Sequence, residues 1–92
     1  MKAELLNEMR KIVNKYDPVG IYYSTKAFDE YDPEIRDICA RFKKSKTLKE
    51  FTKEVYNVFV KWFFPSVAGK REKYTDLSKD LFRLLKNQNK IY

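Results

Sequence analysis

Residues 47–65 read TLKEFTKEVYNVFVKWFFP, and this segment sets the fold class of the chain. Thr47 and Glu50 match a capping box, in which the hydroxyl accepts a hydrogen bond from a backbone N–H and the glutamate reaches back. Apolar side chains then recur at intervals of three and four residues, the spacing of one helix face. They are Leu48, Phe51, Val55, Val58, Phe59 and Trp62. Because Pro65 cannot continue a helix, the sequence predicts a helix from Thr47 to about Phe64.

The C-terminal half of this helix is apolar on nearly every side. Eight of the ten residues from Val55 to Phe64 are apolar or aromatic. Such a helix lies at the centre of a fold or is covered by a partner chain. We therefore expect it to be central. For Phe63 and Phe64, which lie off the main stripe, two outcomes stay open: cover by the loop of residues 17–32, or exposure at a homodimer face.

Three further segments have helical patterning. The first runs from about Lys2 to Lys15, and Pro18 ends it. The next begins at Asp32, which suits the N-cap position, with Pro33 at the first helical position. The last is expected from about Arg71 to Asn87. Their buried stripes comprise Leu5, Met9, Ile12 and Tyr16; Ile35, Ile38, Cys39 and Phe42; and Tyr74, Leu77, Leu81 and Leu84.

An acidic and aromatic segment separates the first two helices. It is bounded by the steps Asp17-Pro18 and Asp32-Pro33, and no sustained period is visible within residues 19–33. Its length and its apolar side chains predict an ordered loop that packs on the core. A helical turn near Thr25–Glu30, or a brief extended piece at Val19–Tyr23, is compatible with the pattern.

The composition indicates one small helical domain. The chain has 92 residues, 43% of them hydrophobic and 16% aromatic, which is enough apolar volume for a core. Only two glycines argue against a sheet with many tight turns. We therefore predict an all-α fold in which residues 1–92 form a single helical domain. It is expected to be a compact bundle of four main helices, with the ordered acidic, aromatic loop between the first two.

The residue inventory excludes most catalytic chemistry. The chain has no histidine, which removes Ser–His and Cys–His nucleophile pairs and all His-ligated metal sites. The single cysteine, Cys39, lies on an apolar stripe and is expected to be an inert core residue. Asp17, Asp29 and Asp32 offer oxygens of the kind that Mg²⁺ binds in a small enzyme, but turn and capping roles are favoured for them. We therefore expect no cofactor, no metal and no enzymatic activity.

The expected compartment is the cytoplasm. Residues 1–8 lack the apolar core of a signal peptide, and no apolar run is long enough to span a bilayer. One cysteine allows no intramolecular disulfide, which agrees with a reduced setting.

The acidic, aromatic loop is the favoured contact surface. Its carboxylates and tyrosines combine charge with rigid aromatic anchors, as protein interfaces do. The candidate residues are Tyr22, Tyr23, Asp29, Glu30, Tyr31 and Asp32. The leading hypothesis is therefore a small non-enzymatic protein-interaction module whose partner the sequence does not name.

A basic segment supports an alternative function. Residues 1–40 carry a net charge of −2 and residues 41–92 a net charge of +9. Phosphate backbones attract such positive density, so nucleic-acid binding is the alternative. The residues concerned are Arg41, Lys43, Lys44, Lys46, Lys49 and Lys53. A solvated lysine-rich face is favoured over binding, since lysines outnumber arginines fifteen to five.

The chain resembles the YugE-like family of small uncharacterised helical proteins from Bacillus-type bacteria. The resemblance rests on Tyr16-Asp17-Pro18-Val19-Gly20-Ile21 and Asp29-Glu30-Tyr31-Asp32, in this order between the first two helices. The chain departs from the family at Tyr16, where Trp is expected, and in its high lysine content. The resemblance implies an all-helical cytoplasmic domain of no known activity. Some toxin-immunity proteins carry a similar Asp-Pro-x-Gly turn, so an inhibitor or immunity role stays open.

Overall fold

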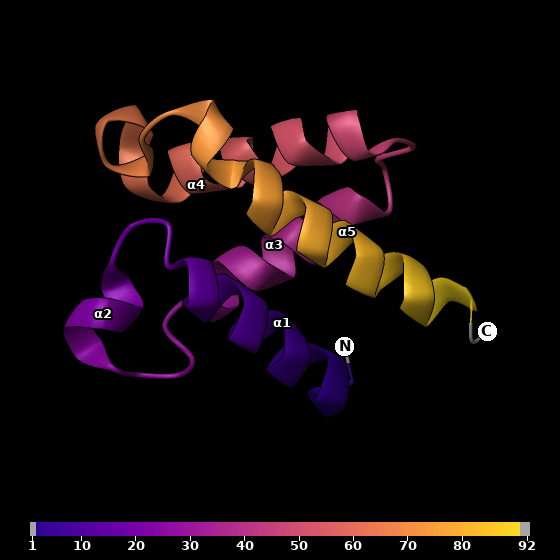
Figure 1. Cartoon of the computed structure of the whole chain (residues 1–92), viewed down its shortest axis with the longest axis horizontal. Coiled ribbons are helices and arrows are strands. Elements are labelled where there is room, and N and C mark those ends of the chain that lie inside the picture. Colours follow the sequence, from indigo (N-terminus) through magenta and orange to yellow (C-terminus); the bar gives the residue numbers. More distant parts are fainter. Residues whose placement is uncertain (1, 91–92) are drawn as a thin grey trace.

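The computed structural model describes residues 2–90, and the side chains of residues 2–88. Within these residues the chain forms helices and no strand, so the predicted all-α fold with four main helices is confirmed (Figure 1). The elements are α1 (Ala3–Tyr16), α2 (Ile21–Thr25), α3 (Asp32–Phe42), α4 (Leu48–Ala68), the 3₁₀ helix η1 (Arg71–Tyr74) and α5 (Thr75–Lys90).

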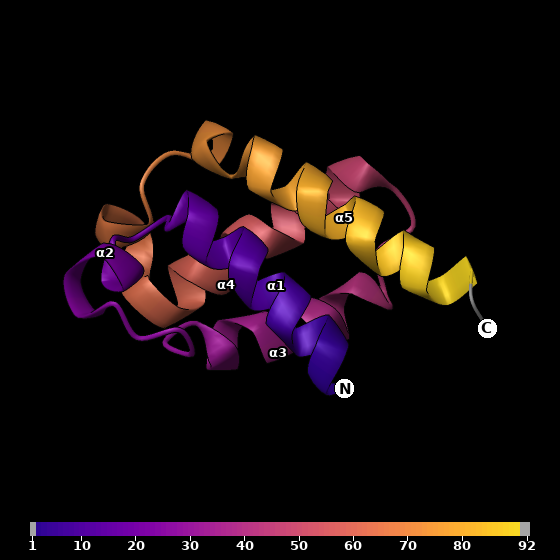
Figure 2. The same ribbon diagram turned by 60° about the horizontal axis from the view of Figure 1, so that its bottom comes forward.

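The four long helices form a closed ring around one core. Both α1 and α4 pack against α3 and against α5 (Figures 1 and 2). The helix after Thr47, which was expected to be central, is α4; it forms one wall of the ring and packs against α3, α5 and η1. Burial of large apolar side chains in the middle of the ring supplies the main stabilising term. The core comprises Met9, Val13, Tyr31, Ile35, Ile38, Phe42, Phe51, Val55, Val58, Phe59, Ala68, Tyr74, Leu77, Leu81 and Leu85.

The start of α4 follows the sequence prediction. The hydroxyl of Thr47 accepts a hydrogen bond from the backbone N–H of Glu50 at 3.1 Å, which is the threonine half of the capping box. Four of the six predicted stripe residues are buried. Leu48 is half-buried and Trp62 is 44% exposed, so the prediction that Trp62 belongs to the core is wrong.

The end of α4 is interrupted one residue before Pro65. Phe64 has φ 67° and ψ 156°, a non-helical conformation inside the element, and one more helical turn follows as far as Ala68. The ψ value is what a following proline demands, but a positive φ is strained for any residue with a Cβ. The predicted boundary at Phe64 therefore marks a break in the helix.

Tyrosine hydroxyls hold the connection between α4 and α5. The buried hydroxyl of Tyr74 donates a 2.6 Å hydrogen bond to the carbonyl of Ala68, and Tyr56 reaches the carbonyl of Gly69 at 3.3 Å. These bonds satisfy carbonyls at the end of α4 that no helical N–H reaches. The predicted fourth helix begins as the 3₁₀ turn Arg71–Tyr74 before α5 starts at Thr75.

The segment between α1 and α3 contains a short helix and a turn. The helix, α2, covers Ile21–Thr25, so the extended piece at Val19–Tyr23 does not form. The expected turn near Thr25–Glu30 is displaced toward α3, where residues 28–31 form a turn and the N–H of Asp32 bonds to the carbonyl of Asp29 at 3.1 Å. The predicted N-cap role of Asp32 is also wrong. Tyr31 occupies the N-cap position of α3, and Asp32 is the first helical residue.

Both views place α2 and the last turns of α4 at one end of the long axis (Figures 1 and 2). The connection between α3 and α4 lies at the opposite end. The molecule measures 37 × 26 × 18 Å. Within residues 2–90, none of the helices combines the length and the apolar character that crossing a membrane requires.

Candidate functional site

Asp17 organises the acidic, aromatic loop. Its carboxylate accepts hydrogen bonds from the backbone N–H groups of Tyr22 (3.0 Å) and Tyr23 (2.9 Å), and from the hydroxyl of Tyr31 (2.7 Å). The first two bonds satisfy N–H groups in the first turn of α2. Partial burial disfavours the charged form of Asp17, but the three hydrogen bonds outweigh it, so the pKa lies below the ordinary value.

Two of the six predicted contact residues, Tyr31 and Asp32, make their contacts inside the protein. Tyr31 is 1% exposed, and its ring packs edge-on against Phe59 at 5.9 Å between centroids. The carboxylate of Asp32 receives two hydrogen bonds from the Arg10 guanidinium, at 2.9 and 2.6 Å. This bidentate contact lowers the pKa of Asp32, and it ties α1 to the start of α3.

The other four predicted residues differ among themselves. Tyr22 is half-buried and packs against the core, whereas Tyr23 is 77% exposed with the Lys26 ammonium 4.7 Å from its ring centroid. Asp29 and Glu30 are exposed. The loop therefore presents one tyrosine and two carboxylates to solvent, instead of six contact residues.

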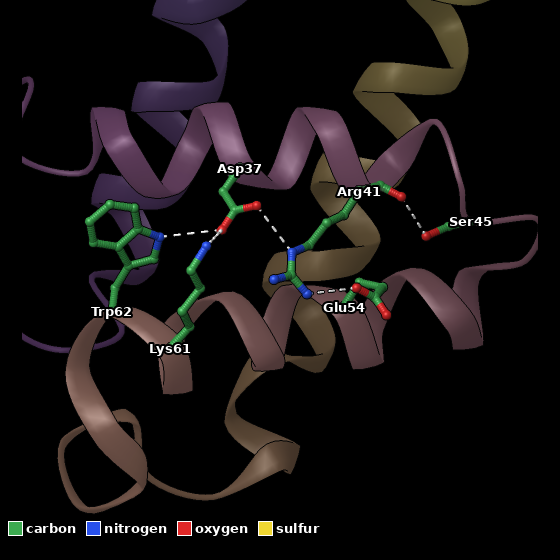
Figure 3. A network of polar contacts seen from close by, with 6 residues as sticks. All are labelled: Asp37, Arg41, Ser45, Glu54, Lys61 and Trp62. Carbon is green, nitrogen blue, oxygen red and sulfur yellow. Dashed lines mark hydrogen bonds and ion pairs between the residues drawn. The ribbon is translucent and has the colours of Figure 1, made fainter.

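A polar network joins α3 to α4 and pairs Arg41, one of the predicted nucleic-acid-binding residues, with carboxylates (Figure 3). Arg41 contacts Asp37 at 3.1 Å and Glu54 at 2.8 Å. Asp37 also accepts from the indole N–H of Trp62 at 3.3 Å and lies 3.5 Å from the Lys61 ammonium. Partial burial opposes ionisation of Asp37, but the contacts with Arg41, Trp62 and Lys61 lower its pKa overall.

The remaining predicted basic residues lie together at one end of the bundle. We call this group the basic end: Lys43, Lys44, Lys46, Lys49 and Lys53. They belong to the connection between α3 and α4 and to the first turns of α4, and all five are exposed. In the described part of the chain none of them makes an ion pair. Arg71 extends the group, because it and Lys49 line the same shallow groove between α4 and η1.

Exposed apolar side chains occur on α2 and on the last turns of α4, the two elements at the other end of the long axis. We call this group the apolar end: Tyr23 on α2 (77% exposed), and Trp62 (44%), Phe64 (71%) and Val67 (50%) on α4. Phe63 is not part of it, because its ring is half-buried and stacks on Phe59 with 6.0 Å between centroids. The sequence predicts the same environment for Phe63 and Phe64. In the structure Phe63 is half-buried and Phe64 is exposed, and the backbone break falls at Phe64.

The carboxylates and the single cysteine are the remaining candidates for metal binding or nucleophilic chemistry. Among residues 2–90, no set of three or more Cys, Asp or Glu side chains is placed to hold a metal ion. Cys39 is half-buried, with its Sγ 3.3 Å from the Met9 sulfur. Burial raises the pKa of this thiol, which is the environment of an unreactive cysteine.

Two features of the site were missed by sequence reasoning. The first is the cap that Asp17 provides for α2, whose only signal is an Asp five residues before a Tyr-Tyr pair. The second is the backbone of Phe64, because nothing in an aromatic-Pro step requires a positive φ. Both depend on contacts or strain that a periodicity does not encode.

Comparisons with known proteins add no assignment. No family model, no curated protein and no solved structure matches this chain.

Proposed function

We propose that this chain is a small non-enzymatic protein-interaction module that binds through the apolar end, with a second copy of itself as its partner. The observation that carries the proposal is Phe64, which is 71% exposed although its backbone is strained at φ 67°. A strained backbone conformation persists only where the surrounding structure compensates for its cost. Such residues are found most often at functional sites. An exposed aromatic ring held in this way, on the same helix as the exposed side chains of Trp62 and Val67, supports a contact surface at this end.

Charge favours a second copy in one orientation. The chain carries a net charge of +7, so two copies repel each other when their basic ends approach. Contact through the apolar ends leaves the basic ends at the far ends of two molecules, each 37 Å long. That separation far exceeds the Debye length of about 8 Å at physiological salt. The geometry is that of a two-fold dimer, in which the same patch is used on both copies.

The test compares two exposed phenylalanines by size-exclusion chromatography with light scattering. Phe64→Ser removes the exposed ring that carries the proposal and should weaken self-association by about tenfold or more, as expected for an interface anchor. Phe28→Ser is the matched control, because Phe28 is also exposed (42%) but lies beside Arg10 of α1, outside the apolar end. Equal association of wild type and both variants, or a wild type that stays monomeric at all concentrations, contradicts the proposal.

A second candidate function is nucleic-acid binding by the basic end. The observation that favours it is a group of five exposed lysines without ion-pair partners in the described residues. A gel-shift assay with duplex DNA should then show an affinity that falls steeply with salt. Replacing these lysines by glutamine should abolish the shift, whereas Lys79→Gln with Arg83→Gln on α5 should not. Dimerisation through apolar side chains does not weaken at high salt, so salt separates the two functions.

The resemblance to the YugE-like family, the cytoplasmic compartment and an inhibitor or immunity role stay predictions. An inhibitor role is the form of the proposal in which the partner is a different protein. It would use the same apolar end.

A further inference from the structure

A groove between the ends of three helices has an apolar floor. It encloses about 600 Å³ and lies where the C-terminal part of α3 faces α5 and the start of α1. Leu5, Cys39, Phe42 and Leu85 contribute apolar atoms to its lining. Its volume is within the range of about 300–1,000 Å³ typical of small-molecule sites.

The rim of the same groove is uniformly positive. Three of its lining residues, Arg36, Lys43 and Lys86, are cationic, and among the described residues no carboxylate lines it. All three are exposed, and none of them makes an ion pair in the described part of the chain. Lys86 lies 5.3 Å from the ring centroid of Phe82, which holds its ammonium beside the groove without neutralising it.

The adjoining hollow shows that this charge pattern is particular to the groove. That hollow shares Leu5 and Gln88 with the groove and has a similar volume of about 640 Å³. Its lining mixes Glu4 and Glu8 with Lys2 and Lys11, so it favours neither an anionic nor a cationic ligand. Of these two hollows, the groove is the one whose described lining combines an apolar floor with cations and without carboxylates.

We propose that this groove binds a single-chain amphiphilic anion, such as a medium-chain fatty carboxylate. The hydrocarbon chain would lie on Leu5, Phe42 and Leu85, where burial of apolar surface is favourable. The head group would meet the guanidinium of Arg36 and the ammonium groups of Lys43 and Lys86. The inference does not depend on the proposed function, because the groove lies on α1, α3 and α5, away from the apolar end.

Cys39 makes the groove directly observable. It is the only cysteine of the chain and lines the groove, so a thiol reagent reports on this site alone. The experiment measures the rate at which a disulfide reagent modifies Cys39, with laurate added below its critical micelle concentration. Laurate should slow the modification in a saturable manner. Inorganic phosphate and neutral dodecyl maltoside should each have a much smaller effect, because each supplies only half of the ligand's chemistry.

Variants that each lose one positive charge test whether the rim cations bind the head group of laurate. Arg36→Gln and Lys86→Gln should each raise the laurate dissociation constant about three- to tenfold. Lys53→Gln and Lys79→Gln remove the same charge from exposed positions outside the groove and should change it by less than twofold. Equal weakening by all four variants, or laurate binding that leaves Cys39 unprotected, overturns the proposal. Protection of Cys39 by an acidic amphipathic peptide at lower concentration than laurate also overturns it, since the groove would then be a peptide site.

Discussion

The hydroxyl of Tyr31 donates a 2.7 Å hydrogen bond to Oδ1 of Asp17, and so joins the start of α3 to the end of α1. The same carboxylate caps α2 through the N–H groups of Tyr22 and Tyr23. One aspartate thus fixes both ends of the loop, and Tyr31 acts as a core residue.

Tyr31→Phe keeps the ring in the core and removes this hydrogen bond, together with the one that the hydroxyl accepts from the backbone N–H of Val19 at 3.3 Å. We expect the free energy of unfolding to fall by about 1–2 kcal/mol, because a charged acceptor loses one of three donors. Urea denaturation measures the change. The control is Tyr23→Phe, at an exposed hydroxyl, which should stay within about 0.5 kcal/mol of wild type. A loss of similar size in both variants would mean that the Tyr31 hydroxyl contributes nothing specific.

Glu34 should make stability decrease as the pH rises. It is 4% exposed, with Oε2 lacking a hydrogen-bond partner, and burial raises its pKa above the ordinary value of 4.5. Above pH 4.5 and up to its raised pKa, the native state holds a proton that the unfolded state has lost, so the free energy of unfolding falls through this window. Relative to wild type, Glu34→Gln should gain stability between pH 4 and pH 7. A pH-independent difference between the two proteins would show that Glu34 titrates normally.

Arg41 should contribute to stability and not to binding. Arg41→Gln leaves Asp37 and Glu54 without their shared partner, and we expect a loss of about 1 kcal/mol, the upper range for partly exposed ion pairs. Lys44→Gln removes an exposed, unpaired charge and should change the stability by less than about 0.5 kcal/mol. Thermal unfolding at low and high salt distinguishes the two. Equal effects would place Arg41 with the solvated lysines.

The backbone of Phe64 should store measurable strain. Phe64→Gly and Phe64→Ala remove the same exposed ring, but only glycine adopts φ 67° with ψ 156° without a steric penalty. The strain of about 1–3 kcal/mol is offset in part by the larger unfolded-state entropy of glycine, so the glycine variant should be more stable by about 1 kcal/mol. Chemical denaturation of the pair gives this difference directly. If the alanine variant is the more stable one, the backbone is not strained.

Much of the fold could be predicted because it depends on local pattern. The helical stripes, the Thr47 cap and the break near Pro65 follow from spacing and from residue chemistry. Trp62 was misplaced because its indole N–H bonds to Asp37 of α3, and the side chain stays 44% exposed although Ala68, later in the same helix, is buried. A periodicity gives the face of a helix but not the polar partner that a side chain finds on a neighbouring helix.

The candidate surfaces were less predictable because they depend on partners distant in sequence. Asp32 had the right residue type for an N-cap, but Arg10, twenty-two residues earlier, takes its carboxylate. In the same way, the guanidinium of Arg41 is paired with Glu54, thirteen residues later, and does not add to the exposed positive charge of the basic segment. The five lysines of the basic end make no such ion pair in the described part of the chain, and the sequence could not separate them from Arg41.

The most direct test of the proposed function is the distance between labels on two copies of the chain. In a Cys39→Ser background, a spin label at Val67 reports on the apolar end and one at Lys46 on the basic end, and both positions are exposed. Dimerisation through the apolar ends predicts a defined intermolecular distance for the Val67 label. The Lys46 labels should give none, because two molecular lengths separate them. The absence of an intermolecular distance at Val67, or a shorter one at Lys46, would contradict the proposal.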